Sequence, residues 1–457
     1  MTIKDRNTIF LVIVGIVFIN IIPFSILSPI LVLLFGVTLG LLIVAIFVPD
    51  DFNFLFGFYL IGFGIRVFLS FLSYNVSFFL KGNYSPGFIF PNDAWSYSQQ
   101  GWQIAKFLER GITVTRETFG SDPNMYVWGR SGNITEYDFF SSFIYSITGY
   151  SPLSLFFISG LAGSLAALFI YLIAKELFSK NVARVSCLFA FFWPSFILWS
   201  TQNLKDPVIA MFVCILLWTI FYIYRHASPG FLLLSFISVL ALLKIGLIYL
   251  VIIASMIFFT GLFLFIKYLF KNKFVVILIV CFIILAVSLL FSKPILSYIS
   301  KHSVYDILRH DTIFEFLDYR RSGGTYGRLA LFKDANISSF DKAMAFAPLG
   351  LLYAIFAPFP WQLGSINQII AVPETMLFYI LVPFTLKGIV FAYKKRVNQS
   401  VLLLSIIISI LLFLTLAEGN AGTLFRHRSI PFYLLFIFTA AGISLKKSSR
   451  NILKNEA

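Results

Sequence analysis

Asp93 is a carboxylate at the start of a predicted amphipathic helix, in the stretch FPNDAWSYSQQGWQIAKFLERG that covers residues 90–111. A carboxylate at a membrane surface, followed by aromatic residues, is suited to accept a proton from a substrate hydroxyl group. The alternative is a structural role, because an Asn or Asp at this position caps the first turn of a helix. The two roles are compatible, and both place Asp93 at the beginning of a helix.

Three further positions put ionisable groups beside or inside apolar segments. Lys205 and Asp206 stand in STQNLKDPVIAMF, Lys244 in LALLKIGLIYL and Arg66 in IGFGIRVFLSF. Such groups are costly at membrane depth and by default indicate a functional site or a buried partner. The alternatives are a helix start at Asp206, with Pro207 in the first turn, and a Lys244 side chain that extends to the interface.

Two arginine clusters follow later in the chain. Arg320 and Arg321 stand in LDYRRSGGTYGRLALF, and Arg426 and Arg428 flank a histidine in AEGNAGTLFRHRSIPF. The planar guanidinium group binds phosphate oxygens in a bidentate manner. We therefore predict substrate or phosphate binding for both clusters, with anchoring to lipid headgroups as the alternative.

The composition places these residues in a membrane protein. Of 457 residues, 59% are hydrophobic and 12% are charged, and the mean hydropathy is +0.90. A bilayer core requires about 20 consecutive apolar residues per helix, and segments of this kind recur along the chain. The sequence therefore predicts an all-α polytopic membrane protein with about twelve transmembrane helices, at residues 8–25, 28–48, 54–79, 152–173, 183–201, 207–224, 230–245, 247–266, 274–291, 374–392, 399–416 and 429–445.

The basic residues predict the orientation of these spans. The net charge of +15 comes from Lys and Arg that gather at the ends of apolar segments, for example at Lys175, Lys180 and Arg184. This bias is typical of cytoplasmic ends, so we expect both termini in the cytoplasm of a plasma-membrane protein and no binding of nucleic acid.

Two long polar stretches, 80–151 and 292–342, then fall on the extracytoplasmic face. Segment 343–363 contains APFPW, whose prolines interrupt helical hydrogen bonding, so we expect it to re-enter the membrane or lie at its surface rather than span it. The predicted parts of the chain are an N-terminal transmembrane hairpin (1–53), a core with the first outer loop (54–291), a second outer loop (292–373) and the C-terminal helices with a cytoplasmic tail (374–457).

Cofactor motifs are absent from the sequence. The three cysteines, Cys187, Cys214 and Cys281, lie in apolar segments without the spacing of a disulfide framework or a metal site. No nucleotide-binding loop or zinc-protease motif is present. We expect no required cofactor and assign no metal site, and a divalent metal ion stays an open alternative that the residues do not support.

The stretch from Asp93 to Pro207 resembles the membrane-embedded C-type glycosyltransferases, the superfamily of protein mannosyltransferases and aminoarabinose transferases. The shared features are an Asp in the first large outer loop, a Tyr four residues later, a helix that ends in Gly, a G-x-S-P sequence before the next span, and a Pro inside a later span. In this chain they are Asp93, Tyr97, Gly111, Gly149 to Pro152 and Pro194. Many family members carry a paired acidic motif at the first position, where this sequence has Asn92–Asp93.

The resemblance implies an inverting membrane glycosyltransferase. Its donor would be a sugar carried on a polyprenyl phosphate, and its acceptor a hydroxyl group of a glycan, lipid or surface polymer outside the cytoplasm. Asp93 would act as general base, and the residues expected to bind substrate or phosphate are Tyr97, Lys205, Asp206, Lys244, Arg320, Arg321, Arg426 and Arg428. Two alternatives are a polysaccharide polymerase of the O-antigen type and a transporter or flippase of lipids or solutes.

Overall fold

The described residues of the computed structural model are helical and contain no β-strand, which confirms the predicted all-α class. They comprise residues 24–81, 91–114, 134–223, 229–246, 249–250, 252–255, 257–258, 313–324, 330–361, 366–395 and 398–455. The chain forms two compact units. The first consists of Met1–Ile173 with Ala183–Ile245, and the second of Ala174–Val182 with Gly246–Ala457. The division into four parts that the sequence suggested stays a prediction.

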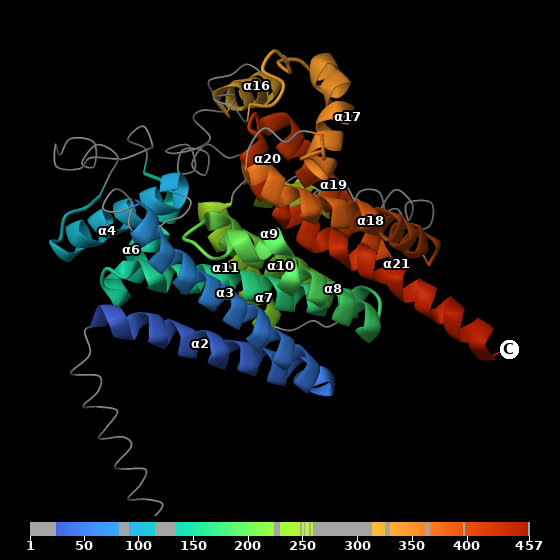
Figure 1. The fold of residues 1–457 in the computed structure, drawn as a ribbon, viewed down its shortest axis with the longest axis horizontal. Coiled ribbons are helices and arrows are strands. Elements are labelled where there is room, and N and C mark those ends of the chain that lie inside the picture. The colour runs from blue at the N-terminus through green and yellow to red at the C-terminus, as the bar shows by residue number, and fades with distance from the viewer. Residues whose placement is uncertain are drawn as a thin grey trace, which may run out of the picture. The chain divides into compact units, whose positions relative to one another are not determined.

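The helices from α2 to α11 build the first unit, apart from the α7–α8 turn, which belongs to the second (Figure 1). Helix α2 leads through a short turn, η1, into the long helix α3, which lies alongside it. The elements are α2 (Phe24–Phe47), η1 (Pro49–Asp51), α3 (Phe52–Lys81), η3 (Pro91–Trp95), α4 (Ser96–Glu109), α6 (Glu136–Thr148), α7 (Pro152–Leu177), α8 (Lys180–Phe192), α9 (Pro194–Trp199), α10 (Lys205–Ile223) and α11 (Pro229–Ile245).

The second unit contains the later helices, of which α18 and α21 pack along one another. Gly388 and Gly442 make this close approach, because a Cβ atom added to Gly388 would lie 1.8 Å from the carbonyl oxygen of Phe438. Small residues allow helices in a membrane to come this close. The elements are α16 (Ile313–Gly324), α17 (Phe340–Phe356), α18 (Ile366–Lys394), α19 (Asn398–Ala417), α20 (Ala421–His427) and α21 (Ser429–Asn455).

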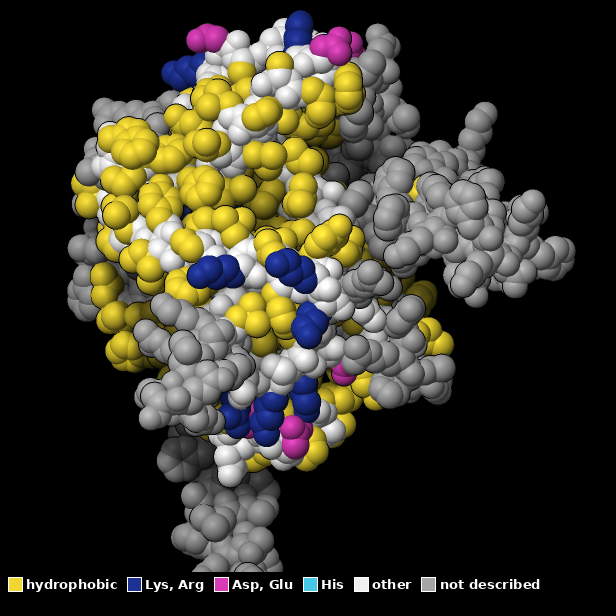
Figure 2. Space-filling model, turned by 90° about the vertical axis from the view of Figure 1, so that its right-hand side faces the viewer, with side chains coloured by type: hydrophobic (Ala, Val, Ile, Leu, Met, Phe, Trp, Pro, Cys, Tyr) yellow, Lys and Arg dark blue, Asp and Glu magenta, His cyan; other side chains and the backbone are white. Residues whose placement is uncertain are grey.

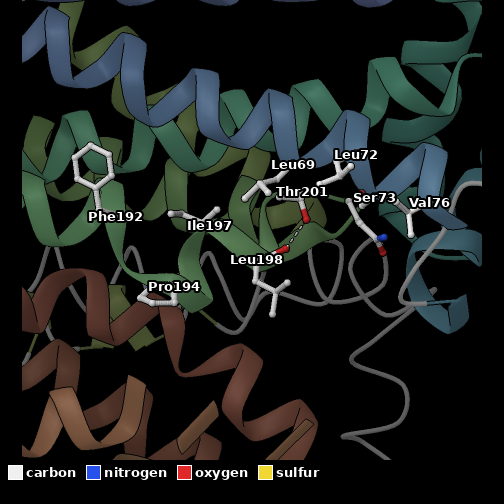
Figure 3. Close-up of a pocket in the computed structure, with 10 residues that line it drawn as sticks. Leu69, Leu72, Ser73, Val76, Phe192, Pro194, Ile197, Leu198 and Thr201 are labelled. Carbon is white, nitrogen blue, oxygen red and sulfur yellow. Dashed lines mark hydrogen bonds between the residues drawn. The ribbon is translucent and has the colours of Figure 1, made fainter. Parts of the chain in front are cut away.

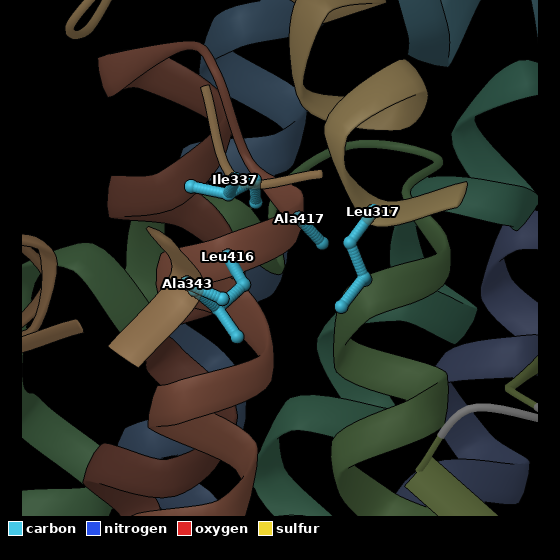
Figure 4. Packing of buried hydrophobic residues seen from close by; sticks show 5 residues of the cluster. All are labelled: Leu317, Ile337, Ala343, Leu416 and Ala417. Atoms are coloured by element: carbon cyan, nitrogen blue, oxygen red, sulfur yellow. The ribbon is translucent and has the colours of Figure 1, made fainter. Parts of the chain in front are cut away.

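A small apolar core joins α16, α17 and α19 within the second unit. Figure 4 shows Leu317 facing Ala417 across this core, with side chains from the α16–α17 connection and from α17 and α19 around them. The buried members are Leu317, Ile337, Ala343, Leu416 and Ala417. This core fixes α16, which carries one of the predicted arginine clusters, against the end of α19.

Six helical segments of the described chain are long and apolar enough to cross a membrane, and a bent helix pair adds a seventh. They are Leu27–Phe47, Pro49–Ser77, Pro152–Leu177, Lys205–Ile223, Ile369–Lys394 and Gln399–Ala417, with Ala421–His427 and Ser429–Leu445 as the bent pair. On the face that Figure 2 shows, hydrophobic side chains cover a broad area and Lys and Arg gather in small groups. The chain is therefore a polytopic membrane protein, and the number of about twelve spans stays a prediction.

Several of the predicted spans either lie outside the described residues or differ from the helices of the structure. Segments 8–25 and 247–266 lie largely, and 274–291 entirely, outside the described residues. The span predicted at 183–201 is not one continuous helix, because α8 ends at Phe192 and α9 begins at Pro194. Proline lacks the N–H group that would continue the helix and its ring clashes with the preceding turn.

The region around 343–394 also differs from the prediction in its helix boundaries. Helix α17 ends at Phe356, so it covers only part of segment 343–363, and it is not among the helices that could span a membrane. Helix α18 begins at Ile366, eight residues before the predicted span. Pro373 therefore lies inside this helix rather than at its start. Whether 343–363 re-enters the membrane stays a prediction.

Candidate functional site

Asp93 lies in the first turn of η3, a wide helical turn that leads directly into α4. Its side chain is half-buried. The N-cap position of α4 is Trp95, which makes no side-chain capping bond. A carboxylate in the first turn of a helix is stabilised by the helix dipole. The structure thus places Asp93 at the start of a helix, as the sequence predicted, and its capping role stays a prediction.

Helix α4 turns a narrow face inward. Ala94 of η3 and Tyr97, Gly101 and Ala105 of α4 are buried, whereas Leu108 is 49% exposed. A Cβ atom at Gly101 would lie 2.6 Å from Ser141 Cβ and 3.1 Å from backbone atoms of α6. The absence of a side chain at Gly101 therefore lets α4 and α6 pack in direct contact.

Tyr137 is the centre of a set of buried polar contacts in the first unit. Its ring packs edge-to-face against Tyr97, with 4.7 Å between the ring centroids. Its hydroxyl group lies 3.0 Å from Asn203 Oδ1 and 2.9 Å from the carbonyl oxygen of Leu204, and it donates its proton to these two acceptors. Burial raises the pKa of Tyr137 well above its usual value of 10.0, so the phenol remains protonated and acts as a donor.

The connection between α9 and α10 meets the start of η3 through this network. Ala94, Phe156 and Leu204 share one buried apolar cluster. Asp93 directly precedes Ala94 in the chain, and Lys205 directly follows Leu204. The residues that carry the carboxylate and the ammonium group are therefore each next in the chain to a residue of this cluster.

Lys205 and Asp206 both lie in the first turn of α10 but differ in burial. Lys205 is half-buried at the first position of the helix, whereas Asp206 in its first turn is 2% exposed. The negative charge of Asp206 acts on Tyr137 and contributes to the raised pKa of its phenol. Asp206 and Tyr97 are both buried, which suits them to orienting other groups rather than to touching a large substrate.

Lys244 is exposed in the last turn of α11. The next residue, Ile245, packs against the buried cluster that contains Tyr97, Tyr137 and Val208. The end of α11 therefore meets the same cluster as α4, α6 and α10. Asp93 and Lys205 are thus each next in the chain to a residue of one buried cluster, and Lys244 is next to a residue packed against another.

Helix α6 contributes polar residues that the sequence analysis did not select. Asp138 accepts hydrogen bonds from the backbone and hydroxyl group of Thr135 at 2.6 and 2.7 Å, which forms a capping box. With its amide nitrogen turned toward this carboxylate, Gln100 donates to Asp138 at 2.9 and 3.1 Å. The Thr-x-x-Asp spacing is the sequence signal that could have identified Asp138. The acceptor Asn203 and the donor Gln100 carry no such signal.

Two of the four predicted arginines bind backbone carbonyl groups of the second unit. Arg321, which is buried, donates to the carbonyl oxygens of Leu331 and Phe332, both at 2.9 Å, and of Ala335 at 3.0 Å. Burial lowers the pKa of Arg321 below its usual value. Its guanidinium group therefore fastens the segment after α16, which argues for a structural role rather than the predicted phosphate binding.

Arg428 also binds backbone carbonyl groups, at the end of α17. Its guanidinium group donates to the carbonyl oxygens of Ala357, Ile355 and Ala354, and its side chain is buried. Carbonyl groups in the last turn of a helix have no partner within the helix, and a buried cation can bind them. This geometry also argues for a structural role.

Arg320 and Arg426 belong to a charged network in the second unit. Arg320 Nη2 lies 3.7 Å from Glu418 Oε1, and the Arg320 side chain is 44% exposed. His427 Nδ1 lies 3.0 Å from the same carboxylate oxygen, and Arg426 Nη2 lies 3.4 Å from His427 Nε2. Because arginine only donates, Nε2 is the accepting nitrogen and Nδ1 carries the proton given to Glu418. Arg320 and Arg426 remain candidates for contact with an anion.

The described residues contain no group of three or more His, Cys, Asp or Glu side chains placed to hold a metal ion. Cys187 and Cys214 are buried free thiols, and Cys281 lies outside the described residues. The geometry of the first unit can instead support proton transfer at Asp93 and electrostatic stabilisation of an anion by Lys205 and Lys244.

Comparison with known proteins shows to which class of protein this chain is similar. The predicted resemblance is to membrane-embedded C-type glycosyltransferases, and it is confirmed by a match of residues 137–291 to a family model. That family is described as dolichyl-phosphate-mannose-protein mannosyltransferase. The matched range includes Tyr137, Lys205 and Lys244, whereas Asp93 lies before it.

One similar solved structure is the oligosaccharyltransferase of Archaeoglobus fulgidus in its apo form. The identity is 16% and the TM-score is 0.48, over 88% of this chain and 52% of that one. This chain therefore spans about half the length of the archaeal protein. No curated protein matches the sequence.

Proposed function

We propose that the protein is an inverting glycosyltransferase that moves a sugar from a polyprenyl phosphate to a hydroxyl group on the extracytoplasmic face of the cell membrane. Two findings support the class: the polytopic helical fold and the match of residues 137–291 to a family whose described donor is dolichyl-phosphate-mannose. The acceptor would be a glycan, a lipid or a surface polymer.

The observation that carries the proposal is the shared packing of Ala94 and Leu204. Both residues belong to one buried cluster with Phe156, and Asp93 and Lys205 are their neighbours in the chain. A base and a cation are the two groups that this reaction requires of the protein. The first must be next to the attacking oxygen and the second next to the leaving phosphate.

In the proposed reaction Asp93 accepts the proton of the acceptor hydroxyl group. The acceptor oxygen forms a bond to the anomeric carbon as the bond from that carbon to the phosphate oxygen breaks. The electron pair leaves with the polyprenyl phosphate, and the configuration at the anomeric carbon is inverted. The sugar–phosphate bond already supplies the driving force, so no nucleotide is consumed.

Lys205 and Lys244 are the cations of the first unit that we assign to the leaving phosphate. Positive charge held in place before reaction stabilises the negative charge that develops on a leaving group. Tyr97 and Asp206 would orient the site from below, because both are buried. In the second unit, Arg320 and Arg426 are the remaining candidates for binding the same phosphate or an anionic acceptor. We do not assign Arg321 and Arg428 to phosphate binding, because their guanidinium groups already donate to backbone carbonyl oxygens.

The test is the Asp93→Asn variant in reconstituted membranes. Loss of a general base lowers the rate by a factor of about 10² to 10⁴, and the isosteric amide keeps the shape of the side chain. The assay follows transfer of labelled sugar from the lipid-linked sugars of the source cells, and the sugar that accumulates in a deletion strain identifies the donor.

Glu109→Gln is the matched control, since Glu109 is exposed at the other end of α4. It should retain full activity. An Asp93→Asn protein that folds like the parent and transfers sugar at the parent rate would rule out Asp93 as the base. Absence of any sugar transfer by the parent protein, with transport of lipid-linked sugar instead, would favour the flippase alternative.

A further inference from the structure

Three aromatic rings meet where α4 packs on the end of α6. They belong to Trp102 of α4, Tyr145 of α6 and Tyr150, which follows α6, and we call them the aromatic platform. The ring centroids are 5.3 Å apart for Trp102 and Tyr150, 5.4 Å for Tyr145 and Tyr150, and 5.9 Å for Trp102 and Tyr145. All three distances lie within the range of about 4.5 to 7 Å that is typical of interacting rings.

The three rings of the aromatic platform differ in burial. Tyr145 is 1% exposed, and its hydroxyl group shares a hydrogen bond with that of Ser98. Trp102 is half-buried, and Tyr150 is 38% exposed. Tyr145 therefore forms the base of the platform, and Tyr150 is the ring that a ligand can reach most easily.

The backbone on both sides of Tyr150 is constrained. Helix α6 ends at Thr148, and Gly149 has a φ of +65°, in the left-handed region that favours glycine. Pro152 then begins α7 with the fixed φ of proline. Tyr150 thus lies in a short turn that is fixed at both ends, so the platform is a built feature of the unit.

Polar groups lie at the edge of the platform. Gln99 Nε2 donates to the hydroxyl group of Tyr150 at 2.8 Å. A carboxamide also has an oxygen that accepts, and a phenol that accepts one hydrogen bond can donate another. The exposed Lys106 has its Nζ 4.9 Å from the centroid of the Trp102 ring, a cation–π contact. The platform therefore combines ring faces with donors and acceptors beside them.

This combination of groups suits a sugar ring. One face of a pyranose consists largely of C–H bonds with weak positive polarity, which pack on the electron-rich face of an aromatic ring. The hydroxyl groups at the edge of the sugar then bind amide and hydroxyl groups fixed beside that ring. A hydrocarbon chain has no use for such polar partners. The chemistry of the platform thus favours a glycan over a lipid as its ligand.

Tyr74 of α3 connects the platform with the candidate active site. Its side chain packs against the buried cluster that contains Ala94 and Leu204. Burial raises the pKa of Tyr145 well above its usual value of 10.0, and the nearby phenols of Tyr150 and Tyr74 raise this pKa further. Tyr74 is therefore close enough to Tyr145 for their charges to interact. The same ring is a neighbour of the platform and of the cluster beside the proposed base and cation.

Contact with α9 supports the part of α3 that carries Tyr74. Figure 3 shows Leu72 and Val76, on either side of Tyr74 in the chain, around a pocket that Leu198 of α9 also lines. From α9 the chain leads through Leu204 to α10. Tyr74 thus belongs to the same framework of helices as the candidate active site.

We infer that the aromatic platform binds one sugar ring of a glycan acceptor, with Tyr150 stacking on the ring and Gln99 binding its hydroxyl groups. The inference rests on the proposed function and deepens it, since it names a glycan as the acceptor. Trp102 follows Asp93 by nine residues of continuous helix, a rise of about 13 Å. This length exceeds one pyranose ring, so the platform binds a sugar unit other than the one that reacts.

The test measures the KM for a glycan acceptor in variants of the platform. The acceptor probe is the envelope polysaccharide extracted from a deletion strain, and the donor is the lipid-linked sugar fraction of the source cells. Tyr150→Ala should raise the KM for the polysaccharide about tenfold and leave kcat unchanged, because a stacking contact away from the base is lost. Gln99→Ala should raise this KM about threefold, the effect of one hydrogen bond.

Phe143→Ala is the matched control, because Phe143 is 63% exposed on α6 and lies outside the platform. It should keep the KM of the parent. A parental KM in both Tyr150→Ala and Gln99→Ala would overturn the inference and leave an aromatic belt at the membrane interface as the role of these rings. Sugar transfer by the parent only to lipids that carry no glycan would overturn it as well.

Saturation-transfer NMR tests binding directly and does not depend on turnover. Irradiation of the aromatic protons of the protein in nanodiscs should saturate C–H protons of the same polysaccharide. The signal should fall at least about fivefold in Tyr150→Ala and stay at the parental level in Phe143→Ala. Absence of the signal with the parent, or an equal signal with Tyr150→Ala, would overturn the inference.

The outcome is separable from that of the proposed function. Sugar transfer that is lost in Asp93→Asn, with a parental KM in Tyr150→Ala, would leave the function standing and remove the platform. Saturation transfer that depends on Tyr150, in a parent protein that transfers no sugar, would do the reverse.

Discussion

Tyr137 connects the residues around the candidate active site more directly than any residue selected from the sequence. Its ring contacts Tyr97 on α4, and its hydroxyl group binds the chain just before Lys205. The half-buried Asp93 and Lys205 are each one residue away from the cluster of Ala94 and Leu204. The placement of the proposed base and cation thus depends on a tyrosine that does no chemistry itself.

We predict that Tyr137→Phe destabilises the first unit by about 1 to 3 kcal/mol, the cost of leaving buried acceptors without their donor. The acceptors are Asn203 Oδ1 and the Leu204 carbonyl oxygen. Thermal unfolding in detergent measures the loss. We also expect a higher KM for the donor, since the start of α10 would no longer be held.

Tyr393→Phe is the matched control, because Tyr393 is 76% exposed, and it should leave unfolding and KM unchanged. Parental stability and KM in Tyr137→Phe would mean that apolar packing alone holds the connection between α9 and α10.

Buried arginines in this protein bind backbone carbonyl groups. Arg66 binds the end of α8, Arg428 the end of α17, and Arg321 the segment after α16. The sequence suggested phosphate binding for Arg321 and Arg428 because a guanidinium group recognises any fixed array of oxygens. Which oxygens surround the guanidinium group depends on which segment distant in sequence packs against it and on where the helix in that segment ends. The local sequence does not contain that information.

At the scale of elements, α6 has its polar face inward and its apolar face outward. Asp138, Ser141 and Tyr145 are buried, whereas Phe143 is 63% exposed and Ile147, one turn later, is 57% exposed. An exposed apolar stripe on an amphipathic helix is suited to the surface of a membrane. The inward polar face is available to bind α4.

Gly101 makes the contact between α4 and α6 possible, and we predict that Gly101→Leu separates them. Overpacking costs about 1 to 3 kcal/mol, and here the clash includes backbone atoms of α6 that cannot rotate away. The expected result is a lower unfolding temperature and loss of sugar transfer, since α4 carries the residues that follow Asp93.

Gly64→Leu provides the comparison, because a Cβ atom at Gly64 would have no neighbour within 4 Å. This variant should behave like the parent. Full activity and stability of Gly101→Leu would show that α4 can shift without effect on the site.

At the scale of the whole molecule, the charges of the chain predict how it is oriented in the membrane. At the start of α3, Asp51 accepts from Arg184 Nε and from the hydroxyl group of Tyr171, both at 2.8 Å. Asp93 follows the other end of the same helix. Lys175, Lys180 and Arg184 all lie near the α7–α8 turn, where the charge bias predicts the cytoplasm.

This orientation predicts the accessibility of introduced cysteines. In a background with the three native cysteines changed to alanine, Glu109→Cys should react with a membrane-impermeant maleimide in intact cells. Asn181→Cys, at the start of α8, should react only after permeabilisation. Both positions are exposed in the structure, so a lack of reaction reports the membrane side. The opposite pattern would place Asp93 in the cytoplasm and exclude an extracytoplasmic reaction.

The sequence by itself determined the class of fold and the location of several candidate residues. Long apolar segments must cross a bilayer as helices, because unpaired backbone groups are too costly in hydrocarbon. The stretch after Asp93 predicted an amphipathic helix, and α4 buries Tyr97, Ile104 and Ala105. These features depend on local composition and period, which a sequence displays directly.

Only the tertiary structure decided which of these residues have common neighbours. Ala94 and Leu204 are far apart in the chain, and so are Arg66 and the end of α8 whose carbonyl groups it binds. Such contacts depend on how helices pack and where a proline interrupts one of them.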